Sequence, residues 1–149
     1  MKSLLLVLLV VALLGVAGSL VIRFWPTEEE LAFDPKLMRM EVVNGCEVPR
    51  LARAVAYEMQ ARGFDVYGVG NTAESHEKSL VVDLLDPGGS NAEKVAQALS
   101  VQPRLWVLPV GGRVEPETRV ALDSARYLEV RLVIGKDYRR FFPRVLPLR

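Results

Sequence analysis

The chain has one cysteine, one histidine and almost no excess charge of either sign. Its 149 residues carry 19 Lys and Arg against 18 Asp and Glu. With Cys46 as the only cysteine, an intramolecular disulfide is impossible, and Cys46 and His76 together are too few for a structural zinc site. The near-zero net charge gives no global positive field that would attract nucleic acid. We therefore expect no metal, no cofactor and no nucleic acid partner.

A catalytic constellation is also missing. His76 lies in a polar stretch, and no nucleophile stands on a strand-to-helix elbow. The turn Asp86–Ser90 leads into a predicted helix, whose first N–H groups can bind an anion. No Lys-Ser or Lys-Thr pair follows its glycines, so a nucleotide P-loop is not indicated, and the alternative is an ordinary capped helix start. We expect a protein that is not an enzyme.

The N-terminal segment contains an uninterrupted apolar run. Leu4 to Ile22 carries no charge, and as a helix it is about 28 Å long, close to the ~30 Å hydrocarbon thickness of a bilayer. We predict a single-pass transmembrane anchor over residues 1–23. The alternative is a cleaved secretory signal with small residues, Gly15 and Ala17, before the cleavage point. A short leader before one apolar helix normally stays inside, so the remaining chain is expected to be extracytoplasmic.

Residues 24–36 are typical of a tether, with an acidic triplet at residues 28–30. The following residues, 37–138, alternate between strand and helix patterns. Strands are predicted at 37–43, 64–69, 80–85, 105–110 and 127–134, helices at 49–63 and 90–99, and a weak helix at 116–126. The order β-α-β-β-α-β-(α)-β predicts an α/β (α+β) domain, a small mixed sheet with helices covering one face.

Two local motifs refine this prediction. Ser90 and Glu93 have the spacing of a capping box at the start of the second helix. In Asn44-Gly45, we expect the asparagine side chain to satisfy the turn backbone and the glycine to supply a positive φ angle.

Three stretches resemble the LytR C-terminal domain family: Glu41–Pro49 with Leu51-Ala52, then Ala61–Val66, and finally Val130–Tyr138 with its Gly-x-Asp ending. The chain departs from that pattern at Cys46, where Ser or Thr is expected, and at Arg50, where Gly is frequent. Members occur behind wall-polymer ligase domains of the LytR-CpsA-Psr type, and also alone behind one membrane helix. The resemblance implies the stand-alone, membrane-anchored form without the ligase domain, in a cell-envelope context.

The C-terminal region interleaves basic and aromatic residues, including a tail at residues 139–149. Such a pattern can grip an anionic polymer or stack on sugar rings. The candidate contact residues are Lys136, Tyr138, Arg139, Arg140, Phe141 and Arg144. In the alternative interpretation, Phe141 and Phe142 pack on the core while the arginines are solvated.

These observations favour a non-catalytic, extracytoplasmic envelope module at the cell membrane. The expected partners are an anionic wall polymer or peptidoglycan, or envelope proteins. Two alternatives remain: a SPOR-like peptidoglycan-binding domain, which uses an open sheet surface, and a pure protein-interaction scaffold, which would expose an apolar patch.

Overall fold

The computed structural model describes residues 10–16, 19, 34–105, 108, 109, 111–123, 125 and 127–146. The chain divides into two compact units, Met1–Phe33 and Asp34–Arg149. In the first unit, residues 10–16 are helical. Within the described part of the chain, no helix is long and apolar enough to span a membrane. The predicted anchor at 1–23, its alternative cleavage point and the tether up to Phe33 otherwise lie outside the described residues.

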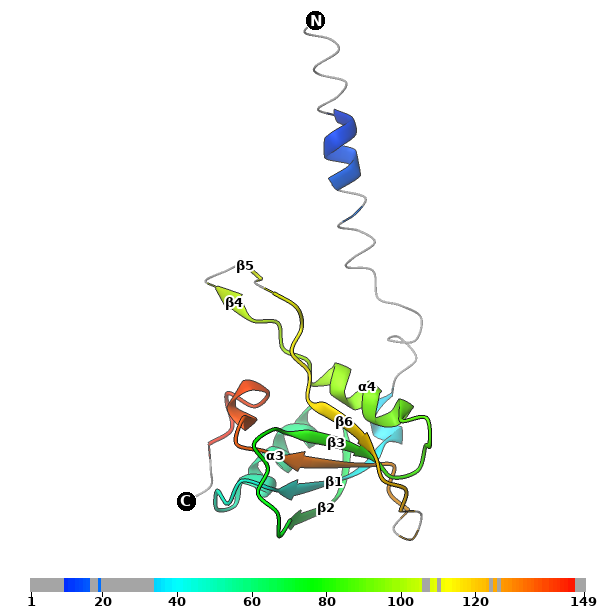
Figure 1. The fold of residues 1–149 in the computed structure, drawn as a ribbon, viewed down its shortest axis with the longest axis vertical. Helices are drawn as coiled ribbons and strands as arrows, with labels where there is room; N and C mark the ends of the chain where they lie inside the picture. Colours follow the sequence, from blue (N-terminus) through cyan, green and yellow to red (C-terminus); the bar gives the residue numbers. More distant parts are fainter. Residues whose placement is uncertain are drawn as a thin grey trace, which may run out of the picture. The chain divides into compact units, whose positions relative to one another are not determined.

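The second unit contains a five-stranded mixed sheet (Figure 1). Its strands lie in the order β2-β1-β7-β3-β6. Strand β1 pairs in parallel with both β2 and β7, whereas β3 pairs antiparallel to β7 and parallel to β6. The bounds are β1 Arg39–Asn44, β2 Asp65–Asn71, β3 Leu80–Asp83, β6 Glu117–Val120 and β7 Val130–Ile134. The mixed α/β sheet is therefore confirmed.

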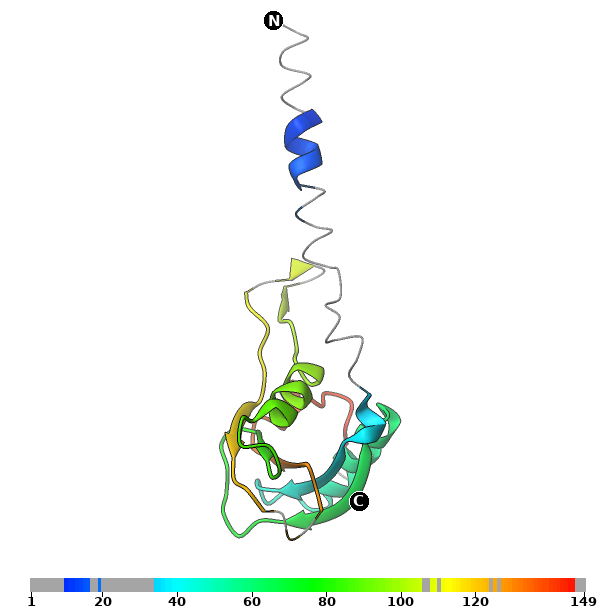
Figure 2. The same cartoon turned by 90° about the vertical axis from the view of Figure 1, so that its right-hand side faces the viewer.

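Two helices complete the domain, α3 (Leu51–Ala61) and α4 (Ser90–Ala98). Helix α3 packs on β1 and β2, and α4 on β3 and β6. The two parallel connections, β1-α3-β2 and β3-α4-β6, run in opposite directions and lead to opposite edges of the sheet. Because both are right-handed crossovers, their helices lie on the same face. Figure 2 gives the side view. The residues beneath the helices include the fully buried Met40, Val42, Val81, Val130, Leu132 and Ile134.

Two predicted elements are wrong. The strand expected at residues 105–110 is instead a short antiparallel pair, β4 (Arg104–Leu105) and β5 (Leu108–Pro109), which lies away from the sheet (Figures 1 and 2). The helix expected at residues 116–126 is replaced over Glu117–Val120 by the edge strand β6. All four of its residues are exposed, so no apolar periodicity marked the strand, and pairing with β3 decided its conformation.

The start of α4 is capped by aspartates rather than by the predicted capping box. Gly89 is the N-cap residue, with a φ of 76°, and Ser90 is already the first helical residue. The buried Asp83 carboxylate accepts hydrogen bonds from the N–H groups of Asn91 (2.9 Å) and Ala92 (3.1 Å). Asp86 accepts from the Ser90 hydroxyl and backbone N–H. The ordinary capped start is confirmed, because the protein's own carboxylates occupy this helix end.

A set of hydrogen bonds, which we name the glycine clasp, joins three loops where β1 and β7 end. The Gly45 N–H donates to Ile134 O (2.8 Å), and Gly45 O accepts from the His76 N–H (2.6 Å). The buried Ser79 donates to the Asp137 carboxylate through its N–H (2.6 Å) and hydroxyl (2.7 Å), and accepts from the Gly135 N–H (3.1 Å). The clasp therefore consists of Gly45, His76, Ser79, Gly135 and Asp137.

Close approach, rather than unusual backbone angles, explains two of these residues. Gly45 is not among the positive-φ residues, so that prediction is wrong. A Cβ at Gly45 would lie 2.8 Å from the His76 ring and 3.0 Å from Ile134 O. At Gly135 a Cβ would lie 2.2 Å from the carbonyl carbon of Lys78, which is backbone and cannot move aside. The Gly-x-Asp ending of β7 is thus a packing and hydrogen-bonding motif.

We predict that Gly135→Ala lowers the free energy of unfolding by about 3 kcal/mol or more, because the added methyl group overlaps the Lys78 backbone. Gly112→Ala is the matched control, since nothing lies within 4 Å of a Cβ there. Urea unfolding followed by circular dichroism measures both. Equal stability of the two variants would contradict the close approach.

The carboxylate of Asp86 makes α4 sensitive to acid. Hydrogen bonds from the Ser90 side chain, then from the Gly88 and Ser90 backbone, hold its pKa below the ordinary value of 3.8. The unfolded chain keeps the ordinary pKa, so this stabilisation is complete above about pH 4 and is lost as the pH falls through the lowered folded-state pKa. We predict that the stability difference between the wild type and Asp86→Asn shrinks over that acid range in urea titrations. A constant difference would show that ionised Asp86 does not support the helix.

Candidate functional site

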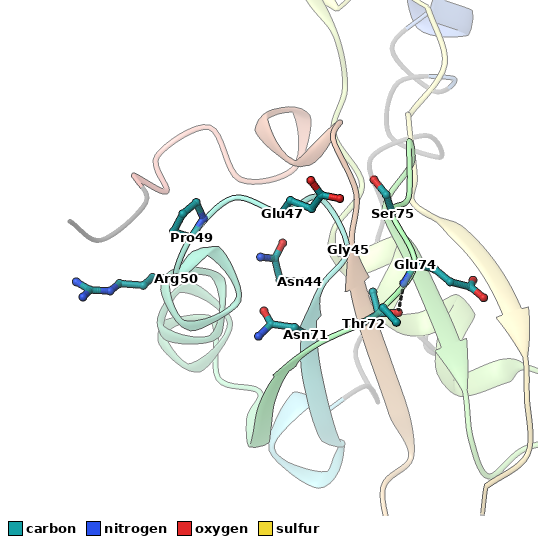
Figure 3. A pocket seen from close by; sticks show the side chains of 10 residues that line it. Asn44, Gly45, Glu47, Pro49, Arg50, Asn71, Thr72, Glu74 and Ser75 are labelled. Atoms are coloured by element: carbon teal, nitrogen blue, oxygen red, sulfur yellow. Dashed lines mark hydrogen bonds between the residues drawn. The ribbon is translucent and has the colours of Figure 1, made fainter.

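A pocket lies at the carboxyl edge of the parallel strands. Because β1, β2 and β7 run in parallel, their carboxyl ends meet at one edge, where α/β sheets commonly bind ligands. The cavity measures about 340 Å³ and opens between the β1–α3 loop and the residues that follow β2 (Figure 3). Its lining comprises Asn44, Gly45, Glu47, Pro49, Arg50, Asn71, Thr72, Ala73, Glu74 and Ser75.

The β1–α3 loop that forms one wall is fixed by Asn44. Its amide donates to Val48 O (2.8 Å), and its side-chain oxygen accepts from the Cys46 N–H (3.2 Å). This confirms that Asn44 satisfies the turn backbone rather than reaching for a ligand. Arg50 has a left-handed backbone, with a φ of 61°, which explains why glycine suits this position in the resembled family.

The chemistry of this pocket is mixed. Glu47 and Glu74 bring negative charge and Arg50 brings positive charge, with Thr72 accepting a hydrogen bond from the Glu74 N–H (3.2 Å). Within the described residues, no group of three or more His, Cys, Asp or Glu side chains is placed to hold a metal ion. His76 lies outside this lining, with its backbone bonded to Gly45 and Lys136.

A second cleft lies on the sheet face opposite the helices. It measures about 440 Å³, and its floor is formed by four aliphatic side chains that belong to one buried cluster, Val43, Leu80, Val82 and Val133. Glu41 and Arg131 form an ion pair at 3.3 Å beside it, and His76 and Arg119 add further polar groups. Arg119 is in turn paired with Glu117 at 2.9 Å, so this open-face cleft combines an apolar floor with walls of ion-paired side chains.

The predicted contact residues of the C-terminal region divide into two groups. The rings are buried: Tyr138 is 6% exposed, Phe141 3% and Phe142 1%. The alternative interpretation of Phe141 and Phe142 is therefore confirmed, and neither Phe141 nor the Tyr138 ring is available to cover a sugar. The basic side chains are exposed at Lys136, Arg139, Arg140 and Arg144.

The environment of these cations differs from one to the next. Lys136 Nζ donates to the Glu77 carboxylate, which raises the pKa of Lys136, and this ion pair compensates the lysine charge locally. The Tyr138 hydroxyl accepts from Arg139 Nε (3.3 Å) and raises the arginine pKa, while the guanidinium lies 5.8 Å from the ring centroid. Among the described residues, no salt bridge joins Arg139, Arg140 or Arg144 to an acid.

Arg62 fastens this C-terminal segment to helix α3. Its guanidinium lies 5.4 Å from the Phe142 centroid and donates to Phe141 O at 3.4 Å. The same group bonds Glu58 at 3.0 Å, so its charge is compensated. We name residues 136–144 the basic segment: its three rings are buried, and its three arginines face solvent.

Sequence reasoning missed two polar residues that shape these surfaces, Ser79 and Asp83. Asp83 carries a signal, because it is the single charge inside the apolar run Leu80–Leu85. A charge in a strand that is buried on both faces requires a partner. Here the partners are the backbone N–H groups in the first turn of α4. Ser79 carries no such signal, because its partners lie 56 and 58 residues further along the chain.

Comparison with known proteins gives one family. Neither the curated proteins nor the solved structures contain a significant match to this chain. A family model described as "LytR cell envelope-related transcriptional attenuator" matches residues 38–138, which span the whole sheet and both helices. The chain therefore belongs to the LytR C-terminal domain family, a cell-envelope-related family.

Proposed function

We propose that this protein is a non-catalytic module of the cell envelope that binds an anionic wall polymer through its basic segment. The observation that carries the proposal is the display of Arg139, Arg140 and Arg144 on a segment whose three aromatic rings are buried. Arginine forms strong, often bidentate hydrogen bonds with phosphate and carboxylate groups. A repeating anionic chain offers such groups at several points at once.

The buried rings give the segment a fixed shape. Complete burial of one such ring stabilises by about 1.5–3 kcal/mol, whereas an exposed ion pair contributes about 0–1 kcal/mol. Core packing, rather than surface charge pairing, therefore holds residues 138–142 in place. The backbone that carries the arginines is ordered before a polymer arrives, which reduces the entropy lost on binding.

We further propose that the module is held at the cell membrane with its domain outside the cytoplasm. Supporting this, the described helical residues Val10, Val11, Leu13, Leu14 and Val16 are 45–66% exposed and present apolar side chains in all directions. Such a surface is compatible with lipid rather than with water. Attachment to a surface raises the effective concentration near the wall and compensates for a weak intrinsic affinity.

We predict that Arg139→Gln/Arg140→Gln/Arg144→Gln weakens co-sedimentation of the full-length protein, kept in mild detergent, with wall sacculi by roughly tenfold. Three lost contacts of about 0.5 kcal/mol each give this factor. The matched control, Lys36→Gln/Lys94→Gln/Arg113→Gln, removes three exposed charges elsewhere in the domain and should bind as the wild type does.

The polymer is identified by stripping the anionic chains from the same sacculi. The proposal expects binding that disappears on the stripped preparation and falls as added salt screens the charges. Equal losses in the two triple variants would mean that only net charge matters. A complete lack of binding to the untreated sacculi would contradict the function itself.

A second candidate, SPOR-like peptidoglycan binding, is favoured by the open-face cleft, because that class of domain uses an exposed sheet surface. Its distinguishing result is binding that persists on sacculi stripped of anionic polymer. In that case Arg119→Glu, which reverses a charge in the cleft wall, should weaken binding several-fold. The arginine variants of the basic segment should then bind as the wild type does.

A further inference from the structure

The outer edge of strand β2 presents unpaired backbone. Within the described residues β2 pairs with β1 alone, and it ends the sheet. The Thr72 N–H donates inward to Asn44 O (3.0 Å). Since backbone groups of successive residues in a strand point to opposite sides, those of Val69 and Asn71 point outward. This edge therefore offers donors and acceptors to an additional strand.

The second half of this edge has few of the features that normally block pairing. The register irregularity at Met40/Glu41 places an extra residue, Tyr67, in β2 before Gly68. From Gly68 to Asn71 the register with β1 is regular, and this stretch contains no Lys and no Pro. Tyr67 is 77% exposed and Val69 51%. A regular, uncharged edge without Lys or Pro can accept an additional strand.

A cleft of about 290 Å³ lies beside this edge. It is lined by Arg50, Ala52 and Arg53 from the start of α3, and by Val69, Gly70 and Asn71 from β2. The first turn of α3 contains no acidic residue, and the side chain of its N-cap residue does not cap the helix start. The Arg53 guanidinium and the helix dipole thus place positive charge in the cleft, next to the outward backbone groups.

We propose that the β2 edge and this cleft bind an extended acidic segment of a protein partner, which joins the sheet as a sixth strand. The backbone of Val69 and Asn71 supplies the ladder hydrogen bonds, and the Arg53 guanidinium donates to a carboxylate of the partner. This site is separate from the basic segment and does not depend on polymer binding.

Charge decides between such a partner and a second copy of this chain. Antiparallel self-pairing through Val69 and Asn71 would be centred near Gly70. It would bring Arg53 of both copies, together with the two positive helix starts, to the same place, where like charges repel. A strand that carries carboxylates would instead be attracted to this positive charge. The edge is therefore matched to an acidic peptide and mismatched to itself.

The test uses the full-length protein in mild detergent and an acetylated, amidated peptide that alternates Glu and Val over seven residues. Fluorescence anisotropy measures binding, and ¹⁵N NMR follows the N–H groups of Val69 and Asn71. We expect saturable binding with shifts at both groups, and at least tenfold weaker binding of an equivalent Lys/Val peptide.

Two variants separate backbone pairing from charge. Val69→Pro removes an outward N–H that makes no bond to β1, so the fold should persist while affinity falls about tenfold. Val69→Thr, the matched control, keeps the N–H and should bind as the wild type does. Arg53→Glu should also weaken binding about tenfold and provides the decisive comparison if Val69→Pro does not fold.

Three results would overturn the proposal. The first is no binding of the Glu/Val peptide by the wild type. The second is binding that neither Val69→Pro nor Arg53→Glu weakens. The third is a wild-type dimer, detected by analytical ultracentrifugation, that Val69→Pro converts to a monomer, since a second copy would then occupy the edge. None of these readouts involves Arg139, Arg140 or Arg144, so failure here is distinguishable from failure of polymer binding.

Discussion

The hydrogen bonds of the glycine clasp are the constraint on which the remaining structure depends. Gly45 and Gly135 let three backbone segments approach at distances that leave no room for a side chain. Ser79 and Asp137 then join the start of β3 to the residues that follow β7. These hydrogen bonds together hold the carboxyl ends of β1 and β7, position the loop after β2 and set the direction in which the basic segment leaves β7.

This constraint connects the fold to the proposed function. The Tyr138 N–H donates to Gly135 O (3.1 Å), so the basic segment begins directly from the clasp. Its rings then pack on the core, and the guanidinium of Arg62, the residue that ends helix α3, lies over the ring of Phe142. Arg139 and Arg140 are consequently carried by a backbone that is held from both ends, and Arg144 follows directly after it. Residues that look like a sugar-stacking surface in the sequence serve as anchors in the structure.

Sequence patterns predicted the elements whose side chains face one core. Helix α3 has Val55 and Met59 at the expected spacing, and β3 is buried on both faces as its apolar run indicated. Patterns failed where distant partners decide. Strand β6 has no buried residue, and its conformation depends on pairing with β3, about forty residues earlier in the chain. The Asp83 cap of α4 likewise replaced a local motif, Ser90 with Glu93, by a longer-range carboxylate.

Of the predicted contact residues, the structure exposes the basic side chains and buries the aromatic rings. Exposure of Arg139, Arg140 and Arg144 follows from their chemistry, because an unpaired guanidinium is rarely buried. Burial of Tyr138 and Phe141 depends on the space that α3 and the clasp leave, which spacing along the chain does not reveal. The same limit applies to the β2 edge, since no pattern within residues 65–71 shows which strand ends the sheet.

The most direct test of the clasp is native-state hydrogen exchange of the backbone N–H groups of Gly45, His76, Ser79 and Gly135. If these groups form one constraint, they exchange with a common opening free energy close to that of the β1 and β7 core strands. Rapid, independent exchange of His76 and Ser79, with Gly45 still protected, would show that the loop after β2 opens on its own. The clasp would then not be what holds the carboxyl edge and the basic segment together.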